Sequence, residues 1–142
     1  VEITETAAIT DIEESAAFVT TLKEIGCLVA IDDFGAGYSS FRNLRALDAD
    51  MVKIDGSFVK NMAESPHDRF LVVTLRELAR HFGMKTVAEW VGDDATARLL
   101  EDAGVEFLQG FHFGKPQLVN QPVIAKTETA QNRDALPRSG AA

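Results

Sequence analysis

Two adjacent carboxylates, Asp32 and Asp33, stand where an apolar run meets a glycine-containing turn. Neighbouring acids repel each other, and a hard divalent cation such as magnesium relieves that repulsion by taking oxygen ligands. The run before them, residues 27–31, is continuous and rich in β-branched residues, which favours a strand buried on both faces. The pair therefore indicates a metal site at the end of a strand. The alternative is that one Asp caps the next helix while the other is solvated in a turn.

Polar residues also stand at the ends of the other apolar runs. They are Glu2 and Glu5 at the first run, Lys53 and Asp55 at the third, Glu89 at the fourth and Gln109 at the last. In (β/α) barrels the C-terminal ends of the strands form one shared mouth, so we expect these side chains to meet. Ordinary alternatives are a surface position for Lys53 and a backbone hydrogen bond for Gln109. Glu2 and Glu5 could instead be an acidic pair at a helix N-terminus. Glu89 is the sharpest case, because a carboxylate inside an apolar segment needs a cation or a proton nearby.

These residue types favour metal-assisted hydrolysis of a phosphodiester. The acids could hold one or two divalent ions that activate a water and stabilise the leaving oxygen. Lys53 could orient that water or neutralise developing charge. Mg²⁺ or Mn²⁺ is expected rather than zinc, because no histidine accompanies the acids: His67 precedes a helix, His81 ends one and His112 lies past the last strand.

The elements that must position these residues alternate along the chain, as is typical of β/α units with a parallel sheet. Short apolar runs predict strands at 1–4, 27–31, 51–54, 85–91 and 106–108. Apolar residues recurring every three or four positions predict helices at 11–25, 39–47, 68–82 and 93–103. Residues 126–142 are polar and without period, and we predict a disordered tail there.

Composition limits the remaining classes of function. The chain has 142 residues, 46% of them hydrophobic, which fits one globular domain with a sizeable core. The net charge of −8 excludes a protein that grips long nucleic acid through a basic surface, but it is compatible with a small phosphate ester held through metals. Cys27 is the single cysteine, so a reducing compartment is expected. No run approaches the ~20 apolar residues of a membrane span. We therefore expect a cytoplasmic domain, either free or as the cytoplasmic part of a larger membrane protein.

Five motifs follow one another along the chain. They are Glu2-Ile3-Thr4-Glu5, the loop from Asp32 to Ser40, Val52-Lys53-Ile54-Asp55, Val87-Ala88-Glu89, and Leu108-Gln109-Gly110-Phe111 with Lys115-Pro116. Their order is similar to that in EAL domains, the family of cyclic di-GMP phosphodiesterases. From residue 1 to about 116 the chain thus resembles the C-terminal part of such a domain. The resemblance implies an α/β fold, a partial (β/α) TIM-type barrel of about five parallel strands alternating with helices, which this chain alone does not close. It also implies hydrolysis of cyclic di-GMP to the linear dinucleotide pGpG in bacterial second-messenger signalling, with Mg²⁺ or Mn²⁺.

The resemblance also implies roles for single residues. Glu2, Asp32 and Asp33 would be metal ligands, and Glu5 would anchor the loop of residues 32–40. Lys53 would contact the nucleophilic water, Glu89 would be the general base or a ligand of a second metal, and Gln109 would support substrate binding.

The chain also departs from the family's pattern. The family's Glu-Ala-Leu motif and a metal-binding Asn would fall before residue 1, and the family's Ala-Glu-Gly-Val-Glu is replaced by Ala-Glu-Trp-Val-Gly at residues 88–92. We therefore expect a fragment, with residues 1–125 forming the C-terminal portion of an EAL-like domain and with no activity of its own. The alternative is a catalytically degenerate module that binds cyclic di-GMP or a partner. Expected partners are cyclic di-GMP, an upstream diguanylate cyclase or sensory domain, and a second copy in a homodimer.

Overall fold

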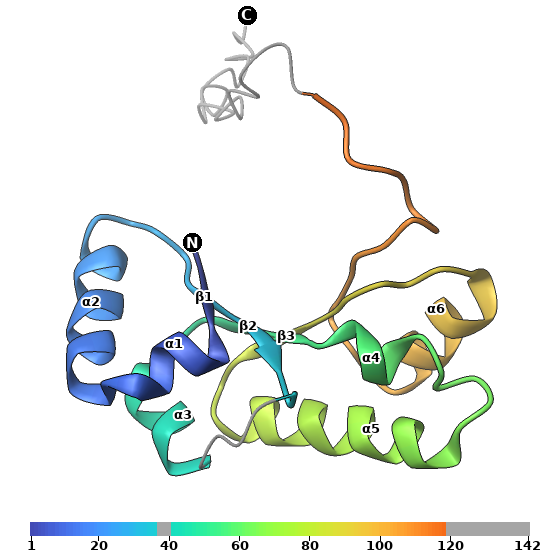
Figure 1. Cartoon of the computed structure of the whole chain (residues 1–142), viewed down its shortest axis with the longest axis horizontal. Helices are drawn as coiled ribbons and strands as arrows, with labels where there is room; N and C mark the ends of the chain where they lie inside the picture. Colours follow the sequence, from blue (N-terminus) through green and yellow to red (C-terminus); the bar gives the residue numbers. More distant parts are fainter. Residues whose placement is uncertain (37–40, 119–142) are drawn as a thin grey trace, which may run out of the picture.

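The computed structural model describes residues 1–36 and 41–118, in which helices lie along one side of a parallel sheet (Figure 1). The strands pair in chain order, and every neighbouring pair is parallel. The strands are β1 (Glu2–Thr4), β2 (Ala30–Phe34), β3 (Met51–Ile54), β4 (Lys85–Ala88) and β5 (Phe107–Leu108). The helices are α1 (Glu5–Thr10), α2 (Ile12–Glu24), α3 (Phe41–Leu47), α4 (Gly56–Val59), α5 (Pro66–His81) and α6 (Asp94–Asp102). The predicted partial barrel is confirmed, and within the described residues β1 and β5 are its open edges.

Local capping sets where the long helices begin. Asp11 caps α2 by accepting a hydrogen bond from the Glu14 N–H at 3.0 Å. Ser65 caps α5 in the same way, and Pro66 occupies the first turn, where its missing N–H costs nothing. The predicted helices at 11–25, 68–82 and 93–103 are therefore present, with ends shifted by one or two residues. The start of the helix predicted at 39–47 lies outside the described residues.

Two predicted strands have wrong boundaries. The strand predicted at 27–31 begins only at Ala30, because the Cys27 N–H bonds the Leu22 carbonyl at the end of α2 and the Val29 N–H bonds the Asp50 carboxylate. The strand then continues through Asp32 to Phe34, so the two acids lie inside β2 and not after it. The strand predicted at 85–91 ends at Ala88, and Glu89 follows it.

Two short helices were not predicted, and both start where a strand ends. The α1 helix follows β1 directly, with the Thr4 hydroxyl accepting from the Ala7 N–H at 3.3 Å. The α4 helix follows β3, with the Asp55 carboxylate accepting from the Ser57 N–H at 2.8 Å. Asp55, one of the polar residues at the predicted strand ends, is therefore a helix cap.

Alternation along the strands separates the core from the candidate site. On β3, Val52 and Ile54 are fully buried in two apolar clusters. Lys53 lies between them, so its side chain leaves the opposite face of the sheet. The helices thus cover one face of the sheet, and the polar side chains gather on the other.

No helix within residues 1–36 and 41–118 is both long enough and apolar enough to cross a membrane. The tail predicted at 126–142 lies outside the described residues.

Candidate active site

Lys53 is the centre of the candidate site. Its Nζ lies 2.7 Å from Glu89 Oε1, 2.9 Å from Asp32 Oδ1 and 3.0 Å from Glu2 Oε2. The Lys53 side chain is 7% exposed and that of Glu89 12%, so water screens this group weakly. We call these four residues the Lys53 cluster. Four sequence-predicted residues from β1, β2, β3 and the segment after β4 therefore meet in one place.

Neighbouring carboxylates keep the Lys53 ammonium charged. Burial on its own lowers the pKa of Lys53, but hydrogen bonds to Glu89, Asp32 and Glu2 outweigh it, so the pKa is raised. The ammonium therefore neutralises part of a concentrated negative charge at every physiological pH.

A β-bulge brings Asp33 to the same site as Asp32. Successive side chains of a strand normally point to opposite faces, which would separate two adjacent acids. Here the pairing of β2 with β3 is interrupted between Ile31 and Phe34, and Asp33 takes the left-handed backbone conformation with φ of 56°. A bulge of this kind re-aims a side chain, often next to an active site. Asp33 is consequently exposed beside the Lys53 cluster although its neighbour Phe34 is buried.

Asp32, Asp33 and Glu89 form a carboxylate triad that fits a metal ion. Each residue offers one carboxylate oxygen, and these three oxygens lie within 4.8 Å of one another. Asp32 Oδ1 is buried and pairs with the Lys53 ammonium at 2.9 Å, and it has no other polar partner within the described residues. A buried carboxylate oxygen with a vacant lone pair is a natural ligand, and an all-oxygen set suits a hard divalent cation.

Glu2 and Glu5 make different contacts, as their different predicted roles require. Glu2 bonds Lys53 and stands outside the carboxylate triad. Glu5 is 3% exposed, and its Oε2 accepts a hydrogen bond from the Gly35 N–H at 2.9 Å. Because Gly35 has φ of 96°, this bond holds the turn that leaves β2 directly after the two acids. The contact matches the predicted anchoring of that loop as far as residue 36.

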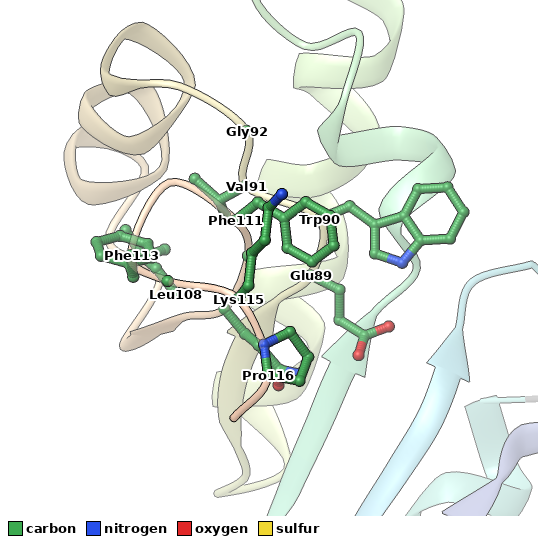
Figure 2. A pocket seen from close by; sticks show the side chains of 12 residues that line it. Glu89, Trp90, Val91, Gly92, Leu108, Phe111, Phe113, Lys115 and Pro116 are labelled. Carbon is green, nitrogen blue, oxygen red and sulfur yellow. The ribbon is translucent and has the colours of Figure 1, made fainter. Parts of the chain in front are cut away.

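Gln109 and Glu89 both line a cavity of about 900 Å³, which Figure 2 shows from close by. Backbone bonds fix this segment, since the Gln109 N–H donates to the Ala88 carbonyl and the Val91 N–H donates to the Gln109 carbonyl. Gly110 then passes so close that a Cβ there would lie 2.1 Å from the Val91 carbonyl oxygen. Glycine is therefore required where the segment after β5 crosses the segment after β4.

Trp90 is a residue of this site that sequence reasoning did not select. It lines the same cavity and is 62% exposed. Figure 2 shows its indole on one side of Glu89 and Phe111 on another, while the Glu89 carboxylate reaches toward the ends of β2 and β3. The only signal in the sequence was the departure from the family's Ala-Glu-Gly-Val-Glu pattern at residue 90.

Comparisons with known proteins show the family to which the chain belongs. The family model described as EAL domain matches residues 1–116. Cyclic di-GMP phosphodiesterase PdeF of Escherichia coli is 39% identical over 116 residues, which are 82% of this chain and 16% of PdeF. The chain therefore spans less than a fifth of that relative.

Two solved structures are similar over the same region. A structure of the MucR phosphodiesterase in complex with c-di-GMP matches with a TM-score of 0.77 at 37% identity, over 81% of this chain and 47% of that one. MucR of Pseudomonas aeruginosa is named a bifunctional diguanylate cyclase/cyclic di-GMP phosphodiesterase. A manganese/cy-diGMP complex of Klebsiella pneumoniae BlrP1 matches with a TM-score of 0.71 at 32% identity, over 78% of this chain and 28% of that one. A divalent metal is thus found with the ligand in a structural relative.

Proposed function

The chain belongs to the EAL domain family, and from that premise we propose that it is the metal-binding part of a phosphodiesterase that hydrolyses cyclic di-GMP to pGpG. The observation that carries the proposal is the carboxylate triad, whose buried Asp32 oxygen has the Lys53 ammonium as its one polar partner within the described residues. Mg²⁺ or Mn²⁺ is the proposed cofactor, because all the ligands on offer are carboxylate oxygens.

The residues of this chain would divide the work as follows. The bound metal would supply a water of lowered pKa and would stabilise charge on the phosphodiester oxygens. Water would add to phosphorus as the bond to the 3′-oxygen breaks; Glu89 would accept the proton that the water loses, and the departing 3′-oxygen would take a proton from solvent to become a hydroxyl. Lys53, 2.7 Å from Glu89, would hold that carboxylate in place and counter the negative charge that grows on the phosphate.

The remaining roles follow from position. Asp32, Asp33 and Glu2 are proposed metal ligands, although Glu2 bonds the Lys53 ammonium in this structure. Glu89, the third member of the carboxylate triad, is the proposed general base or a ligand of a second metal. Glu5 is the proposed anchor of the loop after β2, and Gln109 is a proposed substrate contact at the mouth of the cavity.

A second candidate function is a binding module without catalysis, which the segment after Trp90 favours. The family's second Glu is replaced by Gly92, and the nearest acid is Asp93. Asp93 cannot stand in for the missing Glu, because its carboxylate caps α6, accepting from the Thr96 N–H at 2.8 Å and the Thr96 hydroxyl at 3.1 Å. The bonds from Thr96 also lower the pKa of Asp93.

We further propose that residues 1–125 act as the C-terminal portion of an EAL-like domain in the cytoplasm. A diguanylate cyclase or sensory domain is a proposed partner, by analogy with the name of MucR, and a homodimer is a second arrangement to test.

Turnover of cyclic di-GMP tests the proposal. The chain is compared with a completed domain, in which the part of the MucR EAL domain that this chain does not match is fused to it. With Mg²⁺ or Mn²⁺ we expect the completed domain to release pGpG, detected by chromatography, and the 142-residue chain to show no detectable turnover. A completed domain that binds cyclic di-GMP without ever hydrolysing it would favour the binding module. Robust hydrolysis by the chain alone would contradict the expectation that it is a fragment.

A further inference from the structure

Trp90 combines exposure, position and an unusual backbone. It is the only tryptophan of the chain and is 62% exposed, directly after Glu89. Its φ of 56° lies in the left-handed region, which bulky residues rarely adopt. Glycine takes that conformation without cost. A tryptophan held there points to a function for the side chain, since strained residues of this kind cluster at binding sites.

The indole of Trp90 packs against the backbone of Gly56, and most of the side chain is exposed to solvent. A Cβ on Gly56, the first residue of α4, would lie 2.3 Å from Trp90 Cγ, so the ring lies directly against the glycine backbone. Gly56 is buried, whereas most of the Trp90 surface remains in contact with solvent. A flat apolar surface is thereby held in one orientation, and binding a planar group to it would cost little side-chain entropy.

The Trp90 ring lies next to Glu89, a member of the carboxylate triad, in the lining of the same cavity. Figure 2 shows the indole beside the Glu89 carboxylate, on the side away from Phe113. A base is joined through a ribose to the phosphate, so a phosphodiester held at the carboxylate triad brings its base to the neighbouring surface. Aromatic side chains bind bases by stacking and tolerate any base, because every base has a π-face.

We propose that Trp90 stacks on a guanine base of the substrate and so sets the affinity of this site for purine nucleotides. The proposal rests on the proposed function, because the phosphate must occupy the carboxylate triad. Trp90 is then a specificity-determining residue that takes no part in the proton transfer.

Paired ligands isolate the contribution of the base. GMP and ribose 5-phosphate share the ribose and the phosphate and differ by the guanine. Their affinities, and that of cyclic di-GMP, are measured by calorimetry with Mg²⁺ for the unaltered chain, Trp90→Phe and Trp90→Gly. We expect Trp90→Gly to weaken cyclic di-GMP and GMP binding by about five- to 150-fold, the range that one stacked base supplies. Ribose 5-phosphate binding should be unchanged, and Trp90→Phe should stay close to the unaltered chain because it keeps a ring.

Intrinsic fluorescence gives a second readout, since the chain has one tryptophan. GMP should quench it and ribose 5-phosphate should not. The stacking proposal fails, and the proposed function stands, if Trp90→Gly folds normally by circular dichroism and binds GMP as tightly as the unaltered chain. An unaltered chain that binds neither cyclic di-GMP nor GMP would overturn the proposed function and the stacking together.

Discussion

Glu89→Gln is expected to reduce cyclic di-GMP turnover by the completed domain by about 10²- to 10⁴-fold, the range that general acid–base catalysis contributes. The substitution keeps the size of the side chain and its hydrogen bonding to Lys53, but the amide cannot accept a proton from water. The Glu89 side chain is 12% exposed and lies 2.7 Å from the Lys53 ammonium, so bulk water cannot efficiently accept the proton in its place. Binding of cyclic di-GMP should change far less than turnover.

A matched substitution, Glu101→Gln on the exposed surface of α6, should leave turnover unchanged. Metal uptake separates the two roles open to Glu89. A general base leaves the number of bound Mn²⁺ ions the same in Glu89→Gln, whereas a ligand of a second metal lowers it. Turnover within a factor of about three of the unaltered completed domain would remove Glu89 from the mechanism.

Lys53→Met is expected to give the largest loss of stability in the chain. Methionine fills much of the same volume but leaves Glu2, Asp32 and Glu89 facing one another without a cation. Removing one partner from a buried ionic group costs about 3–5 kcal/mol, because the remaining charges are desolvated and unpaired. The measurement is the free energy of unfolding from urea denaturation at neutral pH without divalent metal.

The loss should depend on divalent metal in a defined direction. Mg²⁺ should stabilise Lys53→Met more than the unaltered chain, because it replaces the missing positive charge. The control is Lys60→Met at an exposed lysine, which should leave stability unchanged. A Lys53→Met deficit that is independent of Mg²⁺ would show that Lys53 acts by packing alone.

The convergence of the site was predictable because parallel strands align their carboxyl ends. Lys53 and Glu89 were selected from apolar runs that end in a polar residue, and the structure brings them within 2.7 Å. The order of the strands follows the order of the chain, so position along each run was enough to place them on one edge. The roles of these residues stay predictions.

The features of the site that the sequence could not predict arise from contacts between segments that are distant along the chain. The bulge that turns Asp33 toward Asp32 arises from the register of β2 against β3, and no local pattern in residues 30–34 specifies it. The orientation of Trp90 depends on Gly56, which lies 34 residues earlier and meets it only through the fold. Asp55 follows β3 as predicted, but its role as the cap of α4 was not predicted, since a strand-end acid and a helix cap look alike before that short helix is known.

Binding of Mn²⁺ by the 142-residue chain tests the central claim most directly, because it requires neither turnover nor the rest of the domain. Free Mn²⁺ is followed by electron paramagnetic resonance as protein is added to the unaltered chain, to Asp32→Asn with Asp33→Asn, and to the control Asp94→Asn with Asp102→Asn on α6. We predict saturable uptake by the unaltered chain and by the control, and loss of that uptake in the Asp32/Asp33 variant. Equal uptake by all three proteins would contradict the assignment of a metal to the carboxylate triad, and with it the proposed phosphodiesterase.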